Sequence, residues 1–233
     1  MSAIEDIDLK QTDSAESAGA ESAGAESAGA ESAGAESAGA ESAGAHPLHA
    51  YLPVMTRSIA IICCLAQVCG LAEWMMLQRE GFQVWQIFTG QLVHWNSNHM
   101  AWDLITFVAL GCLVERIDHK IFVLAVLLGG LASATGWWFL TDLSTYRGLS
   151  GIDSALFMAW IVLQWREVSM IGKYLLSCLV ILALAKAGYE WISMQTLFAN
   201  SQGYVPVPIA HLGGYLAGAI ASLSAVKLWS RKC

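Results

Sequence analysis

The sequence predicts an all-α, polytopic membrane protein in which six transmembrane helices follow a disordered N-terminal tail. Of its 233 residues, 56% are hydrophobic and only 13% are charged, and the mean hydropathy is +0.51. Soluble domains carry about 25% charged residues, so this chain is too apolar to cover itself with polar side chains. A lipid bilayer is therefore its natural solvent. The other two observations behind this fold class are a series of six apolar segments and a long repeat that precedes them.

The N-terminal tail is a low-complexity segment, which we place at 1–50, ahead of a membrane domain at 51–233. From Glu16 to Ala45 the unit ESAGA occurs six times without interruption. A five-residue period gives a helix no continuous apolar face, and alanine is its largest apolar side chain. Such a segment buries too little surface to offset the entropy lost on folding, so we predict disorder. Much of the acid behind the net charge of −7 lies here, which argues against a nucleic-acid partner.

The apolar segments are each long enough to cross the bilayer, which takes about 20 helical residues. We place the spans at 57–77, 99–117, 121–140, 149–166, 171–192 and 207–228. With the N-terminus inside, nine lysines and arginines face the cytoplasm and two face outward. Cytoplasmic loops are enriched in these residues. Both termini are therefore predicted to be cytoplasmic, and the turn GLSG (148–151) is predicted to lie toward the outer side.

Three clusters of polar side chains remain at the outer ends of these spans. They consist of His94, His99 and Asp103 around the start of the second span, Ser150, Asp153 and Ser154 at the start of the fourth, and His211 in the sixth. Polar groups inside a membrane are costly, so each is a candidate functional group. Their common depth is what a single site requires. The six cysteines, by contrast, lie mostly within apolar runs and show no C-x-x-C spacing, so we predict neither disulfides nor a zinc site.

Ser150 has two interpretations. The pattern Ser150-x-x-Asp153 ahead of an apolar run is typical of a capping box, in which the serine binds free backbone N–H groups. Taken alone, a cap is the better interpretation. The alternative is a nucleophile, which needs a neighbouring base to take its proton. His211 could be that base, although a lone membrane histidine could equally bind a neighbouring carbonyl.

Glycines in the sixth span favour the second interpretation. Gly214 and Gly218 lie on the same stripe as His211, and the G-x-x-x-G pattern lets two membrane helices approach closely. If the partner face is the one that carries Ser154 in the fourth span, His211 comes within hydrogen-bond reach of Ser150. We therefore expect these two helices to pack together.

Four motifs in this order resemble those of the rhomboid intramembrane serine proteases. They are the pair His94-x4-His99, the dipeptide Glu115-Arg116, GLSG (148–151) and AHxxGxxxG (210–218). The resemblance covers roughly 80–230 and implies a rhomboid-like helical bundle in a bacterial inner membrane. The phrases FTGQLVH and YRGLSG are most similar to the rhombosortase branch.

The resemblance implies a catalytic dyad with no third acid and no metal or other cofactor. Ser150 would attack a peptide carbonyl, and His211 would carry its proton to the leaving amine. The oxyanion would be held by the Ser150 backbone N–H and the His99 side chain. The remaining support would come from His94, Gly148 and Gly151. The site would open outward as a polar cavity, with a lateral gate toward the lipid.

Two positions depart from the family pattern. Asp103 stands where many members have an asparagine donor, and a carboxylate would repel an oxyanion. It is therefore protonated, directed at His99, or without a role. Ser154 stands where many members stack a tyrosine on the catalytic histidine. His211 must then be held in another way, by Asp153 or by Ser154.

The implied partners are single-span, membrane-anchored protein substrates, which in the rhombosortase branch carry a C-terminal Gly-Gly sorting signal. One alternative is a catalytically inactive rhomboid-like protein that binds transmembrane segments, which Asp103 mildly favours. Another is a metal-dependent hydrolase that uses His94, His99, Asp103 and His211. The i, i+5 spacing of the first two histidines argues against a metal, because it does not place a pair of ligands one helical turn apart.

Overall fold

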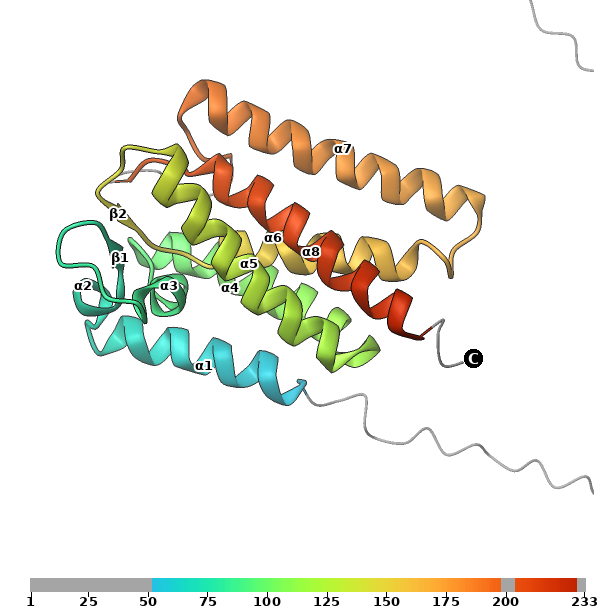
Figure 1. Ribbon diagram of the computed structural model, residues 1–233, viewed down its shortest axis with the longest axis horizontal. Helices are drawn as coiled ribbons and strands as arrows, with labels where there is room; N and C mark the ends of the chain where they lie inside the picture. Colours follow the sequence, from blue (N-terminus) through green and yellow to red (C-terminus); the bar gives the residue numbers. More distant parts are fainter. Residues whose placement is uncertain (1–51, 198–203, 230–233) are drawn as a thin grey trace, which may run out of the picture. The chain divides into compact units, whose positions relative to one another are not determined.

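The computed structural model describes residues 52–197 and 204–229, with side-chain surroundings up to residue 224, and it is mostly helical (Figure 1). The predicted tail at 1–50 lies outside the described residues. In chain order the elements are α1 (Val54–Val68), α2 (Ala72–Met75), β1 (Leu77–Gln78), α3 (Gln86–Thr89), the 3-10 helix η2 (Gly90–Leu92), α4 (Ser97–Ile117), α5 (His119–Leu140), β2 (Thr145–Tyr146), α6 (Ser150–Gln164), α7 (Met170–Ser193) and α8 (Pro208–Trp229).

Six helices of this described part have 15 or more residues, and each lies at the place of a predicted span. Two of them, α5 and α7, are long and apolar enough to cross a membrane by length and composition. Helices α1 and α6 are apolar but have only 15 residues each. The helical class is thus confirmed, whereas the number of spans stays a prediction.

The predicted first span is wrong at its C-terminal end, because α1 stops at Val68 instead of reaching 77. Gly70 adopts a left-handed backbone with φ of 66°, and the N–H of Leu71 turns back to the carbonyl of Ala66. A left-handed glycine of this kind is a common helix terminator. Hydropathy alone could not locate this end, because the residues beyond Gly70 are also apolar.

Of the two interpretations of Ser150, the structure does not support the capping box. Asn96, Asp118 and Ser169 do cap α4, α5 and α7 by accepting backbone N–H groups. The N-cap of α6, however, is Leu149, which makes no side-chain cap, and Ser150 is the first residue of the helix. The Ser150 hydroxyl is therefore not used to cap the helix.

Helix α6 packs against α4, α5 and α8 (Figure 1). Its contact with α8 is made by backbone. A Cβ built on Gly218 would collide with the carbonyl oxygen of Ala155, and one on Gly214 would lie 2.8 Å from the Cβ of Ser154. The glycine stripe of the sixth predicted span thus faces the fourth, with no space for a side chain between them.

The segment between α1 and α4 holds the turn that precedes Ser150. Strands β1 and β2 pair antiparallel, with Leu77 opposite Tyr146. The Arg79 guanidinium donates to carbonyls at the C-terminal end of α5, including that of Trp138 at 2.9 Å. Beyond β2, the N–H of Gly148 donates to the carbonyl of Gly90 at 3.2 Å. These bonds fix the start of α6 against the loop.

Helix α7 packs much less closely than the others. Its buried residues are Leu176, Ala187 and Glu190, and its main neighbour is α8, beside which it lies in Figure 1. Only 11% of the most apolar 18-residue stretch of α7 is buried, against 44% of the corresponding stretch of α5. The polar residue of these three, Glu190, lies near its C-terminal end.

Gly218→Ala should destabilise the protein by about 1–3 kcal/mol, because the added methyl overpacks a backbone contact. Gly188→Ala in α7 is the matched control, since its Cβ would meet nothing within 4 Å. There the change should stabilise by about 0.5–1 kcal/mol through lower backbone entropy. Thermal unfolding in detergent micelles measures both, and equal effects would contradict the close contact.

Candidate active site

One cavity of about 470 Å³ collects most of the predicted site residues. It is lined by side chains from four of the long helices and from the segments that precede α6 and α8. Among them are His99 and Asp103 of α4, Ser150, Asp153 and Ser154 of α6, Glu190 of α7, His211 of α8, Tyr146 of β2 and the loop residue Tyr204. His94 is fully buried beside the cavity. Gly148 belongs to the turn before α6. Gly151, Gly214 and Gly218 lie where helices meet. The sequence-predicted clusters therefore converge.

The turn before Ser150 can be made only by glycine. Gly148 has a φ of 127°, and a Cβ on it would lie 3.0 Å from Cε1 of His99 and 3.1 Å from Oδ2 of Asp103. Both the backbone angle and the space exclude a side chain. The turn leads directly into α6, whose first N–H groups, including that of Ser150, have no acceptor within the helix.

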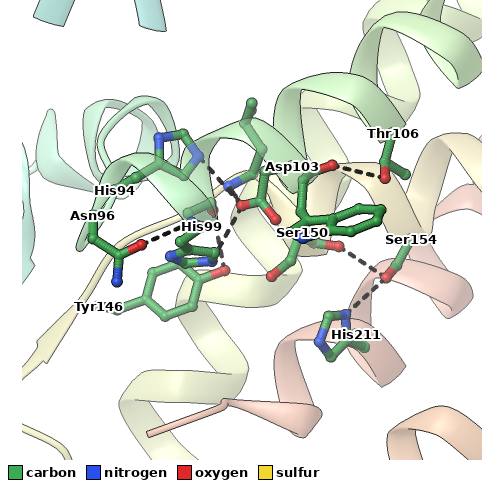
Figure 2. A network of polar contacts seen from close by, with 12 residues as sticks. His94, Asn96, His99, Asp103, Thr106, Tyr146, Ser150, Ser154 and His211 are labelled. Atoms are coloured by element: carbon green, nitrogen blue, oxygen red, sulfur yellow. Dashed lines mark hydrogen bonds and ion pairs between the residues drawn. The ribbon is translucent and has the colours of Figure 1, made fainter. Parts of the chain in front are cut away.

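His211 is held on both sides of its ring. Its Nδ1 lies 3.2 Å from Oγ of Ser154, and its Nε2 lies 3.3 Å from Oε2 of Glu190. The Ser154 Oγ also lies 2.8 Å from the carbonyl oxygen of Ser150 (Figure 2). Of the two residues expected to hold the histidine, Ser154 is therefore the one that contacts it. Asp153 is buried, and its Oδ1 has no hydrogen-bond partner among the described residues.

The expected direct contact between Ser150 and His211 differs from the structure. Within 52–197 and 204–224 no hydrogen bond joins the Ser150 hydroxyl to the imidazole, although both side chains line the cavity. Instead, Ser154 bridges the Ser150 backbone and the ring. Sequence spacing placed the two helices together but could not set the side-chain rotation.

Glu190 is a residue that the sequence interpretation missed. It is 1% exposed, and its Oε1 accepts from the ammonium of Lys186 at 2.7 Å and from the N–H of Leu197 at 3.2 Å. An acid thus lies beside His211, and it is Glu190 of α7 instead of Asp153, the acid considered from the sequence. The signal was present, since Lys186 and Glu190 are one helical turn apart inside an apolar span.

Asp103 connects the two other histidines to the turn (Figure 2). Its Oδ2 lies 3.2 Å from Nε2 of His94 and 3.4 Å from Nε2 of His99. The same oxygen accepts the N–H of Leu149 at 2.9 Å. Of the three roles considered from the sequence, the structure favours the one in which the carboxylate is directed at His99. It adds a second function, which is to hold the residue before Ser150.

Two aromatic rings complete the walls. Tyr204 stacks on His99 with ring centroids 4.7 Å apart, and Nδ1 of His99 is buried without a partner among the described residues. The Tyr146 hydroxyl donates to the carbonyl of Gly148 at 3.4 Å. Burial raises the pKa of Tyr146 above its ordinary value, so this phenol keeps its proton at neutral pH.

The arrangement does not favour the metal-hydrolase alternative. His94, His99 and Asp103 meet, but His211 contacts Ser154 and Glu190 instead of joining them. Among the described residues, no three histidine, cysteine or acidic side chains are grouped so that they could hold a metal ion. What the cavity does provide is a serine at a helix N-terminus and a histidine between two polar partners.

Comparison with known proteins identifies related sequences. The chain matches the family model described as "Rhomboid domain" over residues 81–228. It is 30% identical over 147 residues to proteins named "Rhomboid protease GlpG" from Salmonella paratyphi A, Salmonella newport and Salmonella heidelberg. Each match covers 59% of this chain and 47% of the relative. The chain thus spans about half the length of the curated relatives it matches.

Asp103→Ala should lower the free energy of unfolding by about 3 kcal/mol, because it leaves buried histidine and backbone groups unpaired. Asp142→Ala, at an exposed aspartate, should change it little. Hydrogen exchange should show the Leu149 amide losing protection only in the Asp103 variant. Unchanged protection there would contradict the anchoring of the turn.

Proposed function

This chain belongs to the rhomboid family, and on that premise we propose that it is an intramembrane serine endopeptidase. Ser150 is the nucleophile, and His211 is the general base and then the general acid. The observation that carries this proposal is their shared cavity, in which Ser150 begins a helix and His211 is held by Ser154 and Glu190.

The reaction needs the Ser150 side chain to rotate until its hydroxyl meets the imidazole. The hydroxyl oxygen then forms a bond to the scissile carbonyl carbon while His211 takes its proton. When the carbon–nitrogen bond breaks, His211 returns that proton to the leaving amine, which leaves an acyl ester on Ser150. Water attacks the ester, His211 takes a proton from the water, and Ser150 is released with its own proton restored.

Negative charge on the carbonyl oxygen is stabilised by the N-terminus of α6. The Ser150 backbone N–H is unpaired within the helix, and the helix end carries positive potential. His99, which lines the cavity and has its Nε2 3.4 Å from Oδ2 of Asp103, is the proposed second donor. Gly148 lets the backbone approach this ring closely. Asp103 steadies His99 from the other side of the turn.

We further infer that the protein lies in a bacterial inner membrane and crosses it six times. Both termini are then in the cytoplasm, and the cavity lies toward the outer side. Support comes from the nine-to-two distribution of lysine and arginine and from the six long helices at the predicted positions. The family consists of integral membrane proteins, which agrees with the composition.

The substrates are single-span membrane proteins, and within the rhombosortase branch they carry C-terminal Gly-Gly sorting signals. The phrases that carry this resemblance, FTGQLVH and YRGLSG, lie in contact, since Gly148 of the second donates its N–H to the carbonyl of Gly90 in the first. Gly90 is itself packed against the backbone of Leu77. The two segments therefore form one structural unit beside Ser150.

Ser150→Ala and His211→Ala should each abolish cleavage of a co-expressed single-span reporter and labelling by a fluorophosphonate. The first removes the nucleophile, and the second removes the base that activates it. The reaction in membranes is measured by gel electrophoresis, which shows the shortened reporter, and by release of the reporter's ectodomain on the outer side.

Ser177→Ala in α7 and His119→Ala at an exposed helix start are matched controls that should retain activity. Fluorophosphonate labelling that persists in Ser150→Ala would contradict the assignment of Ser150 as the nucleophile. A wild-type protein that captures the reporter without cutting it would instead support the inactive, segment-binding alternative.

A reporter with a C-terminal Gly-Gly motif ahead of its membrane anchor should be cut faster than one in which Val-Val replaces Gly-Gly. The expected reason is that a small, extended segment is needed to reach Ser150. Comparison of the two initial rates in the same membranes tests the branch assignment, which equal rates would contradict.

A further inference from the structure

We propose that Glu190 is a positioning residue for catalysis, which fixes the ring and the tautomer of His211 and stabilises its protonated form. This inference rests on the proposed function and deepens it. It assigns the catalytic histidine a carboxylate from α7, and it assigns Lys186 the task of keeping that carboxylate ionised.

The burial of Glu190 calls for a reason, because a charged side chain that is 1% exposed is costly unless it is paired. One carboxylate oxygen, Oε1, is satisfied by Lys186 and by the Leu197 N–H. The other, Oε2, is buried and makes no hydrogen bond among the described residues. The neighbouring group with a proton to offer is Nε2 of His211, at 3.3 Å.

Proton accounting then sets the tautomer. The Lys186 ammonium, 2.7 Å from the carboxylate, favours its ionised form, and an ionised carboxylate can only accept hydrogen bonds. Nε2 of His211 must therefore carry a hydrogen. In the neutral ring this leaves Nδ1 without one, so Nδ1 accepts the single proton of the Ser154 hydroxyl, which then no longer goes to the Ser150 carbonyl (Figure 2).

The consequence for catalysis is electrostatic. When Nδ1 takes the Ser150 proton, the ring becomes positively charged and lies between the reacting centre and the Glu190 carboxylate. In a site of low dielectric, that fixed negative charge stabilises the ion that forms. Other polar or charged groups that line the same cavity include Asp153 and Ser154 from α6, His99 and Asp103 from α4, Tyr204 from the loop before α8, and Tyr215 from α8.

Glu190→Gln tests the charge while it keeps the shape. We expect kcat for the reporter to fall about 10- to 100-fold, the factor that one charge-assisted hydrogen bond represents, with KM little changed. Fluorophosphonate labelling of Ser150 should slow by a similar factor. Glu190→Asp keeps the charge and should recover part of the loss. Glu167→Gln, an exposed acid between α6 and α7, is the matched control and should behave as wild type.

A second measurement does not depend on activity, and its decisive arm uses the wild-type protein. Nitrogen-15 NMR of histidine-labelled protein in micelles should show the neutral His211 ring with its hydrogen on Nε2. In Glu190→Leu, which offers no acceptor, the fraction of this tautomer should fall. A wild-type ring with its hydrogen on Nδ1 would overturn the proposal.

The two proposals fail in different ways. If Ser150→Ala abolishes cleavage but Glu190→Gln retains the wild-type kcat, the dyad stands and the positioning role of Glu190 is lost. If Ser150→Ala remains active, the peptidase assignment itself is wrong, whereas the NMR result still decides whether Glu190 sets the tautomer.

Discussion

The backbone contact between α6 and α8 is the constraint on which the site depends. Gly214 and Gly218 bring α8 so close that added side chains would strike α6. At that separation, side chains one turn along each helix must touch, and these are Ser154 and His211. A wider spacing would put lipid or water between them. The chemistry proposed for Ser150 therefore depends on two glycines, which let the helices approach because they have no side chain.

Around this contact, each of two buried carboxylates lies beside several polar partners. Asp103 gathers two histidines and a backbone N–H, and Glu190 gathers a lysine, a backbone N–H and His211. Each carboxylate reaches the cavity from a different helix. Removing either would leave several polar groups unpaired in an apolar surrounding, which is costly. The polar framework thus holds both sides of the cavity.

The long helices and the face of the sixth span that meets α6 could be predicted from the sequence. The other features could not, for identifiable physical reasons. Apolar length located the long helices, and the stripe from His211 to Gly218 predicted the face that meets α6. Hydropathy did not locate the end of α1 at Val68, because apolar residues continue beyond Gly70. Ser150 carried the local pattern of a cap, but the fold starts the helix there with Leu149 as its N-cap. Glu190 was missed although Lys186 stands one turn before it in the same apolar span. Its other partner, His211, lies on another helix, and residue spacing along one helix does not report such a contact.

Helix α7 lies against the bundle with few buried residues, and Glu190 is the charged one among them. Any outward swing of this helix that admits a polypeptide beside Ser150 would also carry the carboxylate away from the imidazole. The open form would then be a resting form, with the base unsupported while the entrance is wide. In the proposed peptidase, the return of the helix would restore the support of His211, so the same residue would link the admission of a polypeptide to the readiness of the base.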